Sequence, residues 1–506
     1  MIIATRRDEY LASLLFNGKL SLMKNYILPR LKDILFLGIF VAVILLGPRM
    51  LNQDGDFPRH LAMGRYVLQY HFPPTTDVFS HTNSGVAFAP HEWLSGVLFF
   101  IIYSLFGLNG IIILSATILA TTFTLIYVAG VARTGTRLPV FFLTVFGAMV
   151  SSLHWIVRPH LLTMLFLAIW LILTERLAEG MKVKLWLFPV IMLLWANLHG
   201  EFIAGFLVLA AYLIGWGWDY FLAETDASTT PGKQFALAIG LSFLATLINP
   251  VGLRIWSTVI GYVNNKYLIS HTNETNPPDF LQPKFLVLLA FLVFSIFLLA
   301  IKKEKITTGH AYLLAGFSAM SLLSARNVHL YGIVAPFVLA PTMQASANFA
   351  YIDRIEILFN KIERQLKGEA WPFAISIFFC FFLAIGPLKD QNRFDPMFFP
   401  VDAVNWLKEN PQEGKMFNNF DWGGYLIFNL WPEKKVFIDS QTDVYGESFT
   451  RKYEQIITLS DNWQDILLGY DVKWVIIPPG WPLSNALKNA GWLEEYHDAT
   501  TVIYSR

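Results

Sequence analysis

Long apolar runs separated by short polar loops dominate the chain. A membrane-spanning helix needs about 20 consecutive apolar residues, and runs close to that length recur along most of the sequence. We expect about eleven spans, at residues 34–46, 111–131, 138–156, 161–173, 185–196, 202–221, 235–248, 285–301, 311–323, 330–340 and 371–385. The pattern therefore predicts an α-helical polytopic membrane protein.

The positions of lysine and arginine predict how the spans are oriented, because short cytoplasmic loops are enriched in both. Basic residues fill the N-terminal segment up to Lys32, and further clusters lie at 133–137, 176–184, 302–305 and 354–367. These clusters occupy alternate loops, which places the N-terminus inside and the C-terminus outside. The apolar segment 93–106 would invert this order if it crossed the membrane. We therefore expect an interfacial helix there, ending at Gly107.

The composition changes to that of a soluble domain from about residue 394 onward. Residues 415–439 read as a strand, a Gly-Gly turn, a short helix and a second strand ending at Asp439, and residues 472–479 and 500–505 are further strand candidates. The expected organisation is a cytoplasmic segment 1–32, a transmembrane domain 33–390 with its first external loop at 51–110, and a small extracytoplasmic α/β domain 391–506.

Composition excludes several classes of protein. A hydrophobic content of 55%, a charged content of 15% and a mean hydropathy of +0.47 do not describe an ordinary soluble chain. The net charge is +1 and no DNA-binding motif occurs, so nucleic acid is not an expected partner. The single cysteine, Cys380, allows neither a disulfide framework nor a cysteine metal site.

Polar and ionisable residues gather in the loops that this topology places outside. Such groups at the mouths of spans are costly unless paired or solvated, and they often mark function, although any one of them could simply contact water. Contact with water is the weaker explanation for Arg158 and for the stretches 197–201 and 324–329. We expect Asp77 to form a turn or cap, while Glu92 either pairs with His91 or caps a helix. The candidate site residues are Asp54, Asp56, Arg59, His60, His91, Glu92, Arg158, His160, Asn197, His199, Arg326 and His329.

Acids on the outer face of a membrane suit transfer of a group from a lipid-borne donor to an acceptor hydroxyl. A carboxylate would act as general base or hold a divalent metal, and nearby arginine and histidine would offset charge on a departing phosphate. An enzyme using a nucleotide sugar in the cytoplasm would need its acids on the opposite side.

The stretches "DGDFPRHLAMG", "HEWL", "VRPHLLT", "WANLHGEF", "SARNVHL" and "DWGGYL…VFIDS" resemble a group of bacterial proteins in the GT-C superfamily of polytopic glycosyltransferases. The resemblance implies a polyprenyl-phosphate-linked sugar donor, a glycan, lipid or protein acceptor, and a place in the bacterial plasma membrane. It implies that Asp56, and less directly Asp54, is the catalytic base or a ligand of Mg²⁺ or Mn²⁺. It also implies that Arg158, His160, Arg326 and His329 face the phosphate or substrate.

This sequence departs from several relatives at Gly55, which separates two acids that those relatives place side by side. Two other classes stay open. One is a non-catalytic scaffold with the same fold, and the other is a transporter or a ligase of lipid-linked glycans.

Overall fold

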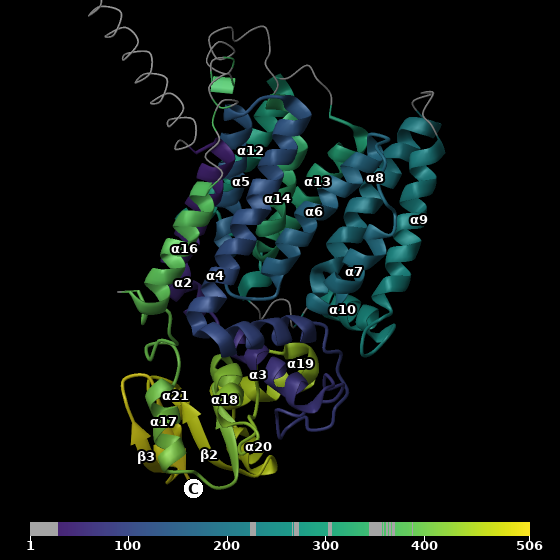
Figure 1. Ribbon diagram of the computed structural model, residues 1–506. Helices are drawn as coiled ribbons and strands as arrows, with labels where there is room; N and C mark the ends of the chain where they lie inside the picture. Colours follow the sequence, from purple (N-terminus) through teal and green to yellow (C-terminus); the bar gives the residue numbers. More distant parts are fainter. Residues whose placement is uncertain are drawn as a thin grey trace, which may run out of the picture.

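The computed structural model describes residues 29–222, 229–265, 267, 273–301, 306–343, 357, 359–360, 363, 366, 370–386 and 388–506. A bundle of helices forms one part of the protein, and a smaller domain with a sheet lies at one end of it (Figure 1). The first 28 residues, the basic clusters 302–305 and 354–367 (apart from the few residues described there) and His271 lie outside the described residues.

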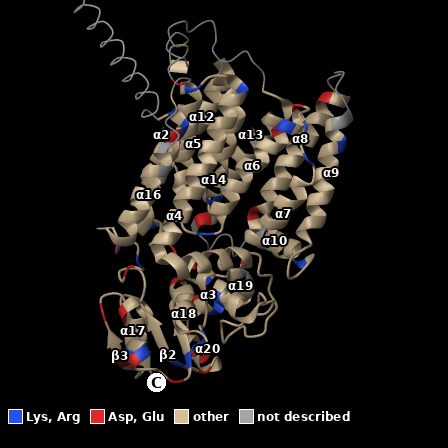
Figure 2. Cartoon of the chain, in the orientation of Figure 1, with Lys and Arg blue, Asp and Glu red and all other residues tan. Residues whose placement is uncertain are grey.

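Each of the eleven apolar segments overlaps a helix of the bundle, although the segment 138–156 continues past the end of its helix at Ser151. These helices are α2 (Leu31–Asn52), α4 (Trp93–Thr134), α5 (Leu138–Ser151), α6 (His160–Ala178), α7 (Leu187–Leu198), α8 (Ile203–Phe221), α9 (Thr229–Thr246), α12 (Leu286–Ile301), α13 (Thr308–Leu323), α14 (Val328–Leu339) and α16 (Ala370–Ile385). Five helical segments of the described residues are long and apolar enough to cross a membrane, so the protein has a multi-pass membrane architecture while the count of eleven stays a prediction. Charged residues concentrate at the two ends of the bundle and in the smaller domain (Figure 2).

Helix α4 is broken where the sequence predicted a helix end. Gly107 has φ of 62° and ψ of −160°, a backbone conformation that residues other than glycine rarely adopt. The part of α4 before Gly107 packs on α3 (Asp56–Tyr70), and the close approach of Gly64 to the Gly96 carbonyl leaves no room for a side chain at either glycine. The interfacial position of 93–106 remains a prediction.

The C-terminal domain is a four-stranded mixed sheet with helices. The order is β1 (Lys415–Asn418), β2 (Val472–Ile477), β4 (Val502–Ser505) and β3 (Leu493–His497); β1 and β2 are parallel, and the other pairs are antiparallel. Five helices complete the domain, namely α17 (Val401–Glu409), α18 (Gly423–Leu430), α19 (Thr442–Ile457), α20 (Trp463–Gly469) and α21 (Pro482–Asn489). Three of the four strand candidates are confirmed, and β3 was missed.

The fourth candidate, the strand ending at Asp439, was wrong. Only a single bridge joins this segment to another, between Val436 and Ser80 of the first external loop. The amide Oδ1 of buried Asn418 accepts hydrogen bonds from the backbone N–H groups of Phe437 and Ile438. A side chain therefore satisfies backbone groups that a neighbouring strand would otherwise have satisfied.

The first external loop and the C-terminal domain share one hydrophobic core. Met63 and Val67 of α3 and Phe79 of the loop are buried in the same cluster as Leu426 and Val436. The backbones also meet directly, because a Cβ on Gly55 would lie 1.8 Å from the carbonyl oxygen of Asp421. The C-terminal domain thus holds the start of α3, where the two first-loop acids lie.

Candidate active site

Both first-loop acids contact one guanidinium group. Asp54 Oδ2 lies 2.9 Å from Arg158 Nε, and Asp56 Oδ2 lies 2.8 Å from Arg158 Nη2. Glu274 completes the group, with Oε1 2.8 Å from Arg158 Nη1. Three loops distant in sequence therefore meet at the end of the bundle nearest the C-terminal domain, and Gly55 does not prevent the two aspartates from sharing a partner.

The turn between α2 and α3 orients the acids. Asp54 Oδ1 accepts a hydrogen bond of 2.7 Å from the backbone N–H of Asp56, the first residue of α3. Burial and the nearby charge of Asp56 raise the pKa of Asp54 to about 6, although Arg158 acts in the opposite direction. Asp54 therefore takes up a proton at a higher pH than an ordinary aspartate does.

Glu274 links this group to a second arginine. Its Oε1 lies 3.5 Å from Arg326 Nη1, and Arg326 Nε lies 3.6 Å from Glu201 Oε1. Burial alone would raise the pKa of Glu274, but Arg158 and Arg326 outweigh it and lower that pKa to about 2. Glu274 is therefore ionised at the pH at which Asp54 takes up a proton.

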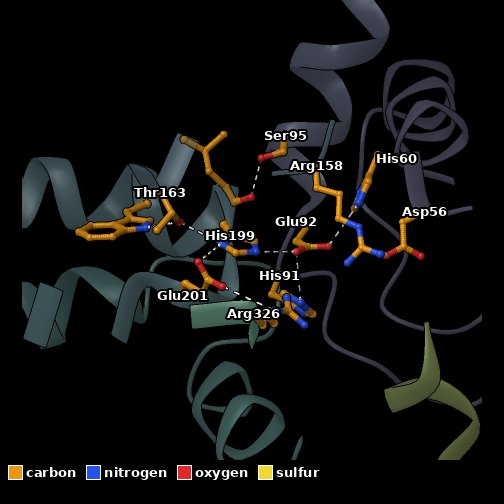
Figure 3. A network of polar contacts seen from close by, with 12 residues as sticks. Asp56, His60, His91, Glu92, Ser95, Arg158, Thr163, His199, Glu201 and Arg326 are labelled. Carbon is orange, nitrogen blue, oxygen red and sulfur yellow. Dashed lines mark hydrogen bonds and ion pairs between the residues drawn. The ribbon is translucent and has the colours of Figure 1, made fainter. Parts of the chain in front are cut away.

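A chain of carboxylates and imidazoles continues from Arg326 toward His60 (Figure 3). His329 Nε2 lies 3.2 Å from Glu201 Oε2, His199 Nδ1 lies 3.5 Å from the same oxygen, and His199 Nε2 lies 3.3 Å from Glu92 Oε1. Glu92 also lies 3.8 Å from His60 and 3.9 Å from His91. The Glu92 carboxylate makes no capping hydrogen bond at the start of α4, so its contacts are those of an acid among imidazoles.

The burial and charge of this chain set its protonation. Burial works against ionisation of Glu92, but the adjacent His91, His60 and His199 lower its pKa to about 2. Burial lowers the pKa of His199 to about 4 and also lowers the pKa of His60. At neutral pH Glu92 is therefore a carboxylate, and the imidazoles of His60 and His199 beside it are neutral and can accept or donate hydrogen bonds.

The remaining predicted residues take positions beside these groups. His160 Nε2 lies 2.9 Å from the carbonyl oxygen of His154, and its ring lies 5.1 Å from that of His329. Asn197 Oδ1 accepts a hydrogen bond from Trp93 Nε1, so this amide ties α7 to the start of α4.

Arg59 and Asp77 lie apart from the Arg158 group. Arg59 Nε lies 3.2 Å from Asp439 Oδ1, and both side chains are almost fully buried. This pair joins α3 to the C-terminal domain. Asp77 Oδ1 accepts a hydrogen bond from the backbone N–H of Phe79, which confirms the expected turn.

The sequence prediction left Glu201 and Glu274 out of the candidate site, and it missed His154 and Asp439. Glu201 follows His199 within the stretch 197–201, so its motif could have included it. Glu274 lies in a polar loop with no apolar periodicity around it, and only the three-dimensional contact with Arg158 identifies it. His154 had been read as part of a span, and Asp439 as the end of a strand.

The carboxylates have the donor chemistry for Mg²⁺ or Mn²⁺ but not the arrangement. Oxygen donors suit both ions, which hold them at about 2.0–2.2 Å in octahedral geometry. Here, however, the oxygens of Asp54, Asp56 and Glu274 are spread around the three nitrogens of one guanidinium. In the part of the chain that the structure describes, no group of three or more acidic, histidine or cysteine side chains is arranged to hold a metal ion.

The fold is similar to that of solved oligosaccharyltransferases. No protein-family model and no curated protein sequence matches the chain. Among solved structures, the chain is similar to the Archaeoglobus fulgidus oligosaccharyltransferase in its apo form, with a TM-score of 0.54, 11% identity, and coverage of 87% of this chain and 69% of that one. Oligosaccharyltransferase AglB from the same organism, in complex with an inhibitory peptide and a dolichol-phosphate, matches with a TM-score of 0.55, 12% identity and the same coverage. The chain therefore shares the fold of these archaeal oligosaccharyltransferases.

Proposed function

We propose that the protein is a membrane glycosyltransferase that moves a sugar from a polyprenyl-phosphate-linked donor to an acceptor hydroxyl on the outer face of the bacterial plasma membrane. The observation that carries this proposal is the meeting of Asp54 and Asp56 on Arg158, at the end of an oligosaccharyltransferase-like bundle. The dolichol-phosphate bound to the archaeal neighbour supports a lipid phosphate as part of the donor.

Asp56 is the proposed general base. Both oxygens of Asp54 are engaged, one by the backbone N–H of Asp56 and the other by Arg158. Asp56 uses only Oδ2 for Arg158, and among the described residues its Oδ1 accepts no hydrogen bond. That oxygen would take the proton of the acceptor hydroxyl as the hydroxyl oxygen bonds to the anomeric carbon of the sugar and the bond from that carbon to the phosphate oxygen breaks.

Arg326 is the proposed ligand of the departing phosphate. Arg326 lies 3.5 Å from Glu274 and 3.6 Å from Glu201, and its side chain is 28% exposed. The side chain of Arg158, which contacts three carboxylates, is 15% exposed. The greater exposure makes Arg326 more accessible to a phosphate, where a guanidinium stabilises the developing negative charge. His329 positions Arg326 by contacting its backbone carbonyl oxygen through Nδ1 at 2.7 Å.

The test uses the purified full-length protein in lipid nanodiscs with a panel of polyprenyl-phosphate-linked hexoses, and it measures release of polyprenyl phosphate in the presence of membrane extracts as acceptor source. We expect Asp56→Asn to lower the rate at least about 100-fold, the lower range of general base catalysis. Asp461→Asn, which removes an exposed charge from the C-terminal domain, serves as the matched control and should leave the rate unchanged.

Two outcomes would contradict the proposal. Release that is unchanged in a folded Asp56→Asn protein would remove Asp56 from catalysis and favour a scaffold with the same fold. Movement of lipid-linked sugar across proteoliposomes, with no transfer product from any donor, would favour a transporter.

A further inference from the structure

Arg158 uses every nitrogen of its guanidinium on a different carboxylate. Nε contacts Asp54 at 2.9 Å, Nη2 contacts Asp56 at 2.8 Å, and Nη1 contacts both oxygens of Glu274 at 2.8 and 3.1 Å. The acids come from the loop after α2 and from the loop before α12. One side chain thus holds together the two first-loop acids and an acid more than 200 residues further along the chain.

The backbone fixes the position of Arg158. The N–H of Val157 donates to the carbonyl oxygen of Met50 at 3.1 Å, and Arg158 is followed by Pro159, which caps the N-terminus of α6. The carbonyl oxygen of Arg158 accepts a hydrogen bond from the N–H of Leu161. The guanidinium therefore projects from a segment tied to the end of α2, next to the acids that it pairs with.

The carboxylate oxygens around Arg158 are arranged to suit a planar guanidinium rather than a metal ion. A guanidinium presents its donors in a fixed plane and remains protonated at all physiological pH values, so it separates the carboxylates instead of drawing their oxygens to one point. A divalent ion bound by Asp54, Asp56 and Glu274 would need their oxygens at about 2.0–2.2 Å from its centre. It would also need Arg158 to leave, since two cations cannot share that position without strong repulsion.

We infer that Arg158 takes the position of a divalent cation between the first-loop acids, so that this site works without a metal ion. The inference deepens the proposed function, on which it rests for its catalytic meaning. Arg158 gathers the acids and balances part of their charge, and it is a positioning residue for Asp56 rather than a group that touches the sugar. Resemblance alone had left a metal at Asp54 and Asp56 open.

The experiment measures Mn²⁺ binding by electron paramagnetic resonance on the full-length protein in detergent. We expect the wild-type protein to bind no stoichiometric Mn²⁺ and its unfolding temperature to be unaffected by EDTA. In Arg158→Met the acids lose their shared partner, and we expect affinity for Mn²⁺ to rise at least tenfold over wild type. Adding Asp56→Asn to that variant should remove the gain. Arg451→Met, which breaks an exposed pair with Glu447, is the control and should gain nothing.

This test does not depend on whether the proposed function is correct, because Mn²⁺ binding requires neither a sugar donor nor an acceptor substrate. One Mn²⁺ bound to wild type and lost in Asp56→Asn would overturn the inference, as would a folded Arg158→Met protein with no gain in affinity. If Arg158→Met does not fold, the wild-type measurement decides alone. Where transfer activity is detected, its persistence in EDTA supports the inference and its loss refutes it.

Discussion

Replacing Gly55 by alanine should disturb the contact between the first external loop and the C-terminal domain. The added Cβ would lie 1.8 Å from the carbonyl oxygen of Asp421, whereas real Cβ contacts almost never fall below 3.0 Å. One backbone must therefore move by at least 1.2 Å, the difference between these distances. The φ of Gly55 is −88°, which alanine adopts without strain, so the cost comes from the missing space alone.

We expect this overpacking to cost about 1–3 kcal/mol, which is roughly a 5- to 150-fold change in an equilibrium. The equilibrium concerned is undocking of the C-terminal domain from α3, so the fraction of undocked protein should rise by that factor. Limited proteolysis of the full-length protein in detergent measures it, because cleavage follows the open population when reclosing is fast. Gly217→Ala is the control, since its Cβ meets nothing within 4 Å.

A second variant tests the same contact from the opposite side. A Cβ on Gly424 would lie 2.5 Å from the carbonyl oxygen of Gly55. Because one separation of the backbones relieves both clashes, we expect Gly55→Ala and Gly424→Ala together to cost less than the sum of the single changes. Cleavage of Gly55→Ala at the rate of the Gly217→Ala control would refute the reasoning.

Three further predictions concern charge. Transfer activity should fall as the pH drops through about 6, because burial and Asp56 raise the pKa of Asp54, and protonation of Asp54 removes one of the charges that hold Arg158 beside Asp56. A pH–rate profile checks this. Asp54→Asn should displace the acidic limb of the profile, whereas an unmoved limb would assign it to another group. Glu175→Ala leaves Arg133, 2.8 Å away and only 13% exposed, without this partner and should destabilise the fold by about 3–5 kcal/mol. Glu447→Ala, at an exposed pair, should cost under about 1 kcal/mol. Thermal unfolding compares the two variants, and equal losses would contradict the burial argument. Arg59→Met should also cost about 3–5 kcal/mol, because Asp439 remains buried without its cation, and adding Asp439→Asn should recover part of the loss in the same unfolding assay.

Hydrophobic length predicted the helices because membrane-type helices satisfy their backbone internally and depend on apolar side chains rather than on distant partners. The break at Gly107 was predicted on other grounds. The alternation of basic loops required that the segment 93–106 does not cross the membrane, and so that a helix ends at Gly107. The strand ending at Asp439 failed because its β-like pattern reflects burial, while its backbone partners are the amide of Asn418 and one bridge to Ser80. Neither partner is visible in the local sequence.

The sequence could predict which residues share one end of the bundle, but not which side chains contact one another. The alternating basic loops placed Asp56, Arg158 and Arg326 together, and their contacts with one another and with Glu274 show that they meet. The side of the membrane on which they lie stays a prediction. Which acids share Arg158 depends on the packing of loops from distant parts of the chain. The residues next to Glu274 in the sequence could not identify it as part of the site. A polar loop residue that pairs with an arginine has the same sequence surroundings as one that only contacts water.

The shared core of the first external loop and the C-terminal domain has a consequence for biosynthesis. The N–H of Val436 donates to the carbonyl oxygen of Phe79, and Trp431 Nε1 donates to that of Val78, so the loop's partners lie more than 350 residues later in the chain. At a translation rate of about 5–20 residues per second, the loop waits roughly 20–70 s for them. During that time Phe79 and Met63 have no partner from the C-terminal domain, and the nascent loop is open to chaperones and proteases. The C-terminal domain, which leaves the ribosome well after the first external loop, therefore completes the region that contains the first-loop acids.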